Sequence, residues 1–169
     1  HSPFILAAGR LTDQKRFDRL IIAYKKSNIY KKYKLVILGV GEKKQELRAL
    51  SQKLGLQDQI LFEGWSNNIY KWMKSASLFV CSSDYESFGM TIVEALYCHC
   101  RVVSTNCKYG PSELLVGTFS KYLSQLNSED LARKILLGLQ EYPTITENVY
   151  SKFDVDKILD KYFKAYKEI

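Results

Sequence analysis

The sequence of 169 residues predicts an α/β fold: a doubly wound parallel sheet of about six strands with helices on both faces. The first observation is a set of short apolar runs without polar alternation, at residues 4–8, 35–38, 60–62, 78–81 and 101–104. Such runs are typical of parallel strands that helices cover on both faces. The second observation is that amphipathic stretches separate the runs, so that strand and helix alternate along the chain.

The stretches between the runs carry apolar side chains at every third or fourth residue, as one face of a helix requires. Gly55 is a plausible stop for the second of these helices, and Asn67 or Asn68 is a plausible cap for the third. Ser128 opens a further helix, and a last one starts near Asp154. The helices expected on this basis lie at residues 17–24, 47–54, 69–73, 128–139 and 154–167.

Length and composition fit one domain over residues 1–169, with no internal repeat or linker. No apolar stretch approaches the roughly 20 residues that cross a bilayer. The formal net charge of +7 favours anionic partners, although a merely soluble basic surface explains it as well. The twelve tyrosines could stack on bases, but many sit at core-like helical spacing, so a nucleic-acid partner is not expected.

The four cysteines fit reduced thiols in a cytoplasmic protein. Cys81 ends an apolar run, which indicates a buried free thiol. Cys98, His99 and Cys100 form a Cys-x-Cys element, but no Cys-x-x-Cys pair accompanies it and the chain has only one other histidine. We therefore expect no metal site.

The carboxyl ends of the predicted strands are where a doubly wound sheet binds its ligand. After the first strand, Gly9 allows a sharp exit, and Arg10 and Lys15 then place two cations at this edge. Arginine grips phosphate oxygens bidentately and lysine adds a point charge, so the pair could balance a diphosphate without a metal. A solvated basic loop is the alternative interpretation.

The ends of the second and third strands carry weaker signals. Gly39 and Gly41 form a Gly-x-Gly, but Lys44 stands where a dinucleotide fingerprint needs a third glycine. This pattern predicts a close approach of backbone, or a plain turn. The third strand is followed by Glu63, Gly64 and Trp65, which either form part of a base pocket or make a turn with the tryptophan in the core.

The fourth strand is followed by the most informative stretch. A helix is expected to begin near Gly89, and its free amides could hold a phosphate. Glu86 precedes that helix and Glu94 lies inside it, among apolar neighbours that argue against simple solvation. Carboxylates beside an anion site need hydrogen-bond donors such as sugar hydroxyls. The stretch therefore indicates a ligand with both phosphates and hydroxyls.

Taken in order, these elements resemble the C-terminal, donor-binding domain of retaining glycosyltransferases of the GT-B fold, and in particular the large GT4-type family, glycosyl transferases group 1. The resemblance runs from Phe4 to the final helix, and the Glu-x7-Glu element is its most specific part. It depends on Gly9-Arg10-Leu11-Thr12 with Lys15, Gly39-x-Gly41, Phe62-x-Gly64 and residues 86–95.

The resemblance implies a Rossmann-like domain and a role for each matching residue. Arg10 and Lys15 would bind the diphosphate of a nucleotide-sugar, which is expected to be a UDP-sugar. Glu94 would accept hydrogen bonds from the ribose, and Glu86 would contact hydroxyls of the transferred sugar. Arg10, Lys15 and Glu86 would thus be catalytic. The implied donor-binding set is Gly9, Arg10, Lys15, Gly39, Phe62, Glu86, Phe88, Gly89, Met90, Thr91 and Glu94.

Within that set, the amides of Phe88, Gly89 and Met90 would face the sugar and phosphates, and Thr91 the phosphate. Residues near Gly39 and Phe62 would line the base. The implied reaction transfers a hexose or N-acetylhexosamine to a glycan, glycolipid or polysaccharide with retention of configuration. Cations and helix amides would stabilise the charge that grows on the leaving diphosphate.

The resemblance also implies that no metal or other cofactor is needed. The one Asp-x-Asp, Asp154-Val155-Asp156, is interpreted as a helix cap. The N-terminal acceptor domain of the family is absent from this chain and is an expected partner, so the chain alone should bind the donor without turnover. Lysines between residues 25 and 34 suggest peripheral contact with an anionic membrane at its cytoplasmic face, or a solvated helix end.

Two other functions remain open at this point. One is a non-catalytic α/β module that only binds nucleotides or scaffolds a partner, which the complete set of motifs disfavours. The other is a nicotinamide-dependent oxidoreductase, which the incomplete glycine pattern at Gly39 and Gly41 makes a poor fit.

Overall fold

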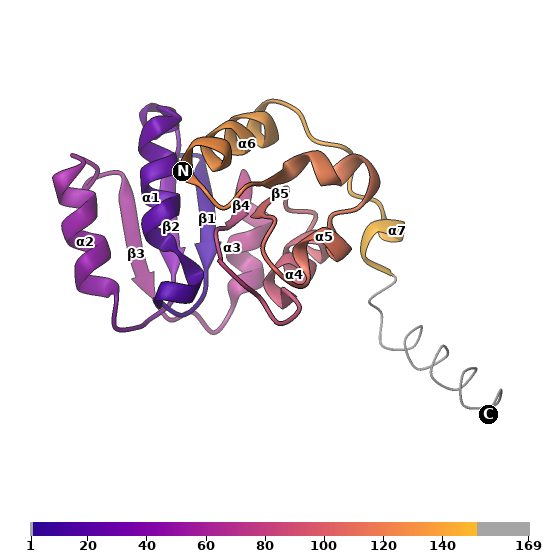
Figure 1. Ribbon diagram of the computed structural model, residues 1–169, viewed down its shortest axis with the longest axis horizontal. Helices are drawn as coiled ribbons and strands as arrows, with labels where there is room; N and C mark the ends of the chain where they lie inside the picture. Colours follow the sequence, from indigo (N-terminus) through magenta and orange to yellow (C-terminus); the bar gives the residue numbers. More distant parts are fainter. Residues whose placement is uncertain (1, 152–169) are drawn as a thin grey trace.

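The computed structural model describes residues 2–151 and confirms the doubly wound sheet (Figure 1). All strand pairings are parallel, in the spatial order β3-β2-β1-β4-β5-β6. The chain changes direction across the sheet between β1 and β4, which are neighbours, and open α/β sheets bind ligands outside the strand ends at such a point. The strands are β1 (Phe4–Ala8), β2 (Lys34–Leu38), β3 (Ile60–Gly64), β4 (Leu78–Cys81), β5 (Val102–Thr105) and β6 (Leu123–Ser124).

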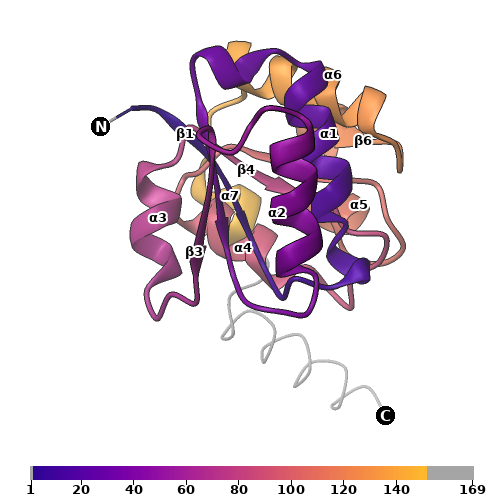
Figure 2. The same ribbon diagram turned by 90° about the vertical axis from the view of Figure 1, so that its left-hand side faces the viewer.

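Helices cover both faces of this sheet, as expected (Figure 2). One face carries α1 (Phe17–Lys26), α2 (Lys44–Lys53) and α6 (Ser128–Gln140). The other carries α3 (Ile69–Ser75) and α4 (Met90–Tyr97). The short elements are α5 (Pro111–Leu114), α7 (Glu147–Tyr150) and the 3-10 turns η1 (Asp13–Lys15), η2 (Ile29–Lys31) and η3 (Gly117–Tyr122).

The five apolar runs coincide with β1 to β5, and the helix caps follow the predicted chemistry. The Asn68 side chain accepts a hydrogen bond from the Lys71 amide at the start of α3. Gly55, with φ of +67°, follows the end of α2. The helix expected at residues 154–167, with Asp154-Val155-Asp156 at its start, lies outside the described residues.

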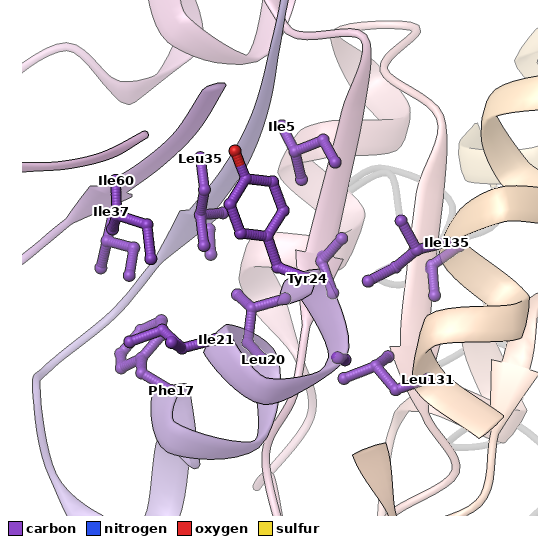
Figure 3. Packing of buried hydrophobic residues seen from close by; sticks show 14 of the residues in the cluster. Ile5, Phe17, Leu20, Ile21, Tyr24, Leu35, Ile37, Ile60, Leu131 and Ile135 are labelled. Carbon is purple, nitrogen blue, oxygen red and sulfur yellow. The ribbon is translucent and has the colours of Figure 1, made fainter. Parts of the chain in front are cut away.

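Strand alternation divides the core into two layers, one on each side of the sheet. Ile5, Leu35 and Ile37 face α1 and α6, and Tyr24 of α1 lies over them (Figure 3). Leu6 and Val36 point to the opposite face, where α3 and α4 pack. Because fully burying each such aliphatic side chain contributes about 1.5–3 kcal/mol, both layers of helices are fixed to the sheet. The strand ends that carry the predicted site are therefore held rigidly.

The close backbone approach predicted for the Gly-x-Gly is confirmed, and the partner is the loop that follows β1. A Cβ on Gly39 would lie 1.9 Å from the carbonyl oxygen of Gly9, and one on Gly41 would lie 2.4 Å from that of Leu11. The Leu11 amide donates to the carbonyl oxygen of Val40 over 2.9 Å. The loops after β1 and β2 thus lie directly against each other, which only glycine permits.

We predict that Gly39→Ala lowers the free energy of unfolding by about 3 kcal/mol or more, because the new methyl group collides with backbone that cannot move aside. Gly55→Ala is the matched control. Gly55 also has a positive φ, but a Cβ there meets nothing within 4 Å, so only conformational strain of about 1–2 kcal/mol applies. Urea denaturation of both variants measures the difference, and equal losses would refute the close approach.

Candidate functional site

Two adjoining cavities open at the carboxyl edge of the sheet, and Arg10 lines both. The first, here called the apolar pocket, has a volume of about 330 Å³ and lies over the ends of β1 and β2. The second, the polar pocket, has a volume of about 550 Å³ and lies between the loops after β1 and β4. The apolar pocket is lined by Ala8, Gly9, Arg10, Leu38, Gly39, Val40, Trp65, Ser66, Ile69 and Thr91. The polar pocket is lined by Arg10, Thr12, Asp13, Gln14, Lys15, Glu42, Tyr85, Glu86 and Ser87.

The loop after β1 brings both predicted cations to this edge. Arg10 is exposed at the junction of the two pockets. Lys15 is the last residue of η1. Its aliphatic side chain packs against Gly9, because a Cβ built on Gly9 would lie only 3.2 Å from Lys15 Cε. The Ser82 hydroxyl donates to the carbonyl oxygen of Lys15 over 2.8 Å, so the backbone of Lys15 is tied to the neighbouring loop. The two cations are placed to meet an anion from the same side.

Glu86 is buried, with 7% of its surface exposed, although it precedes a helix in a loop. Its Oε1 atom accepts hydrogen bonds from Lys15 Nζ at 2.7 Å and from the Ser83 hydroxyl at 2.6 Å. The carboxylate is therefore held by a cation and a neutral donor while it still lines the polar pocket. This arrangement supports a role for Glu86 in ligand binding. It is less consistent with a carboxylate that only stabilises the N-terminus of the following helix.

A second set of ion pairs, which no sequence motif indicates, joins the loop after β4 to Arg16 and to the first turn of α1. Arg19 of α1 has only 6% of its surface exposed, and it donates to Asp84 and to the carbonyl oxygen of Ser82. Arg16, in a left-handed conformation, reaches Asp84 Oδ2 at 3.0 Å and Asp18 Oδ2 at 2.9 Å. Burial alone would raise the pKa of Asp84, but the hydrogen bonds from both arginines outweigh it and lower that pKa.

The α4 helix begins where the sequence predicts, at a glycine in the left-handed region with φ of +89°. The first hydrogen bond inside this helix runs from the Ile92 amide to the carbonyl oxygen of Gly89, over 2.8 Å. The amides of Met90 and Thr91 precede it and belong to the free first turn of the helix. A Cβ on Gly110 would lie 1.9 Å from the carbonyl oxygen of Phe88, so the loop after β5 supports this turn from behind.

Glu94 lies one turn further along α4, on the same face as Thr91. It is half-buried, so the expectation that it is not simply solvated is confirmed. Burial raises the pKa of the Glu94 carboxyl, and a hydrogen bond with Tyr70 of α3 partly opposes that shift. Further hydrogen-bond donors would stabilise the charged form of this half-buried carboxylate.

Two aromatic residues depart from the sequence-based interpretation. Trp65 is 78% exposed at the rim of the apolar pocket, so the alternative that placed it in the core is wrong. Phe62 points away from both pockets, because it follows Ile60 on the face of the sheet that α1 and α2 cover. It lines a separate cavity of about 380 Å³, and the Arg48 guanidinium lies 6.0 Å from its ring.

The structure thus brings most of the predicted set to one edge of the sheet. Gly9, Arg10, Lys15, Gly39, Glu86 and Thr91 line the two pockets. Phe88, Gly89, Met90 and Glu94 lie on or just before α4, which contributes Thr91 to the apolar pocket. Phe62 is not brought to this edge, and Trp65 occupies the position expected of an aromatic residue there.

Between residues 2 and 151, no group of three or more His, Cys, Asp or Glu side chains could hold a metal ion. In the same range, no helix has the length and apolar character needed to cross a membrane. All four cysteines are free thiols, and burial raises the pKa of Cys107 to about 11 and that of Cys100 to about 12.

A family model described as Glycosyl transferases group 1 matches residues 1–152. The chain belongs to this glycosyltransferase family. The expected glycosyltransferase domain of the GT-B fold is thereby confirmed. The alternative interpretation as a nicotinamide-dependent oxidoreductase is not consistent with this family.

Individual glycosyltransferases match over most of the chain. An N-acetylgalactosaminyltransferase that acts on a diphospho-undecaprenol acceptor in Campylobacter jejuni is 42% identical over 111 residues, which is 66% of this chain and 30% of that protein. The poly(ribitol-phosphate) alpha-N-acetylglucosaminyltransferase of Staphylococcus aureus is 28% identical over 170 residues, which is 94% of this chain and 34% of that protein. The chain therefore spans about a third of the length of these curated relatives.

Solved glycosyltransferase structures share the fold of this domain. HepE of Anabaena in complex with UDP-glucose superposes with a TM-score of 0.84 at 26% identity, over 99% of this chain and 49% of that protein. TarM of Staphylococcus aureus, crystallised with UDP among other ligands, gives a TM-score of 0.84 at 24% identity, over 97% of this chain and 35% of that protein.

We predict that Arg19→Met destabilises this glycosyltransferase domain by about 2 kcal/mol or more, because it removes the buried partner of Asp84. Lys26→Met is the matched control, since the Lys26–Glu129 pair is exposed and such pairs are worth about 1 kcal/mol or less. Chemical denaturation of the two variants compares the pairs. Similar losses would mean that the buried pair does not hold the two loops together.

Proposed function

We propose that the chain is the donor-binding part of a retaining, GT4-type glycosyltransferase and that it binds a UDP-sugar at the carboxyl edge of its sheet. The observation that carries this proposal is the convergence of Arg10, Lys15 and Glu86 on two adjoining pockets, to which α4, the helix that holds Glu94, contributes Thr91. Two relatives, one named for a poly(ribitol-phosphate) acceptor and one for a diphospho-undecaprenol acceptor, support an N-acetylhexosamine or hexose donor and a glycan, glycolipid or polysaccharide acceptor.

The division of the site into two pockets suggests how the donor lies. The apolar pocket, with Val40 and Trp65 at its rim, suits a flat base, because an exposed tryptophan offers a face for stacking. The polar pocket, with Glu86 on its wall, suits the hydroxyl-rich sugar. Arg10 lines both pockets, so the diphosphate would lie between them. Glu94 would then accept hydrogen bonds from the ribose.

This arrangement also suggests how the domain would promote transfer. The bond between the sugar and the diphosphate breaks with growing negative charge on the leaving oxygen. Arg10, Lys15 and the amides of Met90 and Thr91 would stabilise that charge more strongly than they stabilise the intact donor. With these groups in place no metal ion is required, so a metal-independent reaction remains part of the proposal.

The same proposal assigns the acceptor site to another domain of the enzyme, so that this chain holds the donor but does not complete the transfer alone. A cytoplasmic location stays a prediction from the four thiols. The lysines suggested for membrane contact lie away from the strand ends that form the pockets. Lys26 pairs with Glu129 and Lys25 lies over Tyr30, which favours the interpretation as a solvated helix end.

We expect titration calorimetry to detect weak binding of UDP to this chain, and Glu94→Ala to weaken it about tenfold because a carboxylate that accepts from hydroxyls contributes about 1.5–3 kcal/mol. Glu129→Ala is the control, since Glu129 is exposed at the start of α6 and should leave UDP affinity unchanged. ADP and GDP test the choice of base. No heat with any of the three nucleotides at millimolar concentration would refute the proposed function, and unchanged affinity in Glu94→Ala would remove the ribose role.

A further inference from the structure

Ser83 is a buried serine in the loop after β4, and it belongs to neither the family motifs nor the proposed catalytic set. It is 1% exposed, and its hydroxyl donates to Glu86 Oε1 over 2.6 Å. A serine hydroxyl has a single proton, so this bond commits its whole donor capacity to Glu86. The contact joins a residue that cannot reach a ligand to one that lines the polar pocket.

Among residues 2–151, the side chains that contact the Glu86 carboxylate all approach the same oxygen, Oε1. Lys15 Nζ lies 2.7 Å from Oε1, and the Cys81 Sγ atom lies 3.6 Å from it. Burial raises the pKa of the Cys81 thiol and the Glu86 charge raises it further, so the thiol keeps its proton and remains a donor. The protein therefore holds Oε1 and leaves Oε2 as the atom for a ligand hydroxyl in the polar pocket.

Ser83 itself is fixed by the neighbouring strand. The Thr105 hydroxyl, at the end of β5, donates to the carbonyl oxygen of Ser83 over 2.6 Å, and Thr105 is fully buried. Further along, the Glu86 amide donates to the carbonyl oxygen of Lys108 over 3.2 Å. Both ends of the segment from Ser83 to Glu86 are thus attached to β5 and its loop, which makes Ser83 a rigid support.

Lys15 and Ser83, the two main hydrogen-bond donors to Oε1, would respond differently to a bound diphosphate. Lys15 is a cation with 19% of its side chain exposed, and the proposed diphosphate would draw it away from Glu86. Ser83 is neutral and enclosed, so a bound diphosphate has no comparable effect on it. When Lys15 turns toward the phosphates, the bond from Ser83 would continue to set the orientation of the carboxylate.

We propose that Ser83 is a positioning residue that fixes the Glu86 carboxylate, so that Oε2 meets a hydroxyl of the donor sugar while Lys15 serves the diphosphate. The inference rests on the proposed function and deepens it, because it makes recognition of the sugar depend on a residue that touches neither sugar nor nucleotide.

The test compares the affinities of the chain for UDP, UDP-glucose and UDP-N-acetylglucosamine by calorimetry. The quantity of interest is the ratio of the UDP dissociation constant to that of each UDP-sugar. Ser83→Ala is expected to lower this ratio about tenfold, as Glu86→Ala should, while UDP affinity changes less than about twofold. Ser83→Thr keeps the hydroxyl and should retain the ratio.

Ser51→Ala is the matched control, because Ser51 is also a buried serine but its hydroxyl bonds to the carbonyl oxygen of Leu47 within α2. It should leave the ratio unchanged. If Ser83→Ala does not fold, Thr105→Val keeps the volume, removes the hydroxyl that fixes Ser83, and should lower the ratio in the same direction. An unchanged ratio in that variant would overturn the inference.

The outcomes separate this inference from the proposed function. If the unmodified chain binds none of the three compounds, the proposed function fails and the inference fails with it. If Glu86→Ala lowers the ratio and Ser83→Ala does not, the function stands and the positioning role is overturned. An equal loss of UDP and UDP-sugar affinity in Ser83→Ala would mean that the residue is structural only.

Discussion

The candidate site depends on ion pairs that join two loops across the middle of the sheet. β1 and β4 are neighbours in space, but about seventy residues separate them in the chain, and the loops that leave them turn in opposite directions. The Lys15–Glu86 contact and the contacts of Arg16 and Arg19 with Asp84 bridge these loops. Because Arg19 is buried and donates to both Ser82 and Asp84 of the loop after β4, separation from that loop would leave an uncompensated charge in the protein. The crevice that any doubly wound sheet has at this point therefore becomes a defined pocket with a carboxylate on its wall.

A second constraint closes the other side of the same crevice. Gly39 and Gly41 allow the loop after β2 to lie against the loop after β1, and this contact places Val40 beside Arg10 in the apolar pocket, which Trp65 also lines. The loop after β1, which carries Arg10 and Lys15, is thus held by backbone contact with the loop after β2 and by ion pairs with the loop after β4. It is therefore fixed in position without a ligand. A preorganised site of this kind loses little entropy when an anion binds, which suits the proposed role in holding a nucleotide-sugar.

The sequence predicted the elements that depend on local pattern and missed those that depend on distant partners. The runs of β1 to β5 and the start of α4 at Gly89 follow from hydrophobic pattern and glycine chemistry, whereas the two-residue β6 has too few residues to show a pattern. Arg19 lies one residue before the apolar Leu20 and Ile21, and its partner Asp84 is 65 positions away, so spacing could not pair them. The resemblance places Phe62 in the base pocket, but Phe62 lies two residues after the buried Ile60 and therefore on the same face of the sheet, which α1 and α2 cover. This spacing is visible in the sequence and predicts the observed orientation of Phe62.

We propose that a nucleoside diphosphate binds between the loops after β1 and β4, and chemical-shift mapping is the most direct test of that position. A ¹⁵N-labelled chain titrated with UDP reports the position of the ligand at every assigned amide. We expect the largest shift changes at Gly9 and Arg10, at Gly39 to Gly41, and at Gly89 to Thr91. Changes confined to the lysine-rich surface between residues 25 and 34, or none at millimolar UDP, would contradict it.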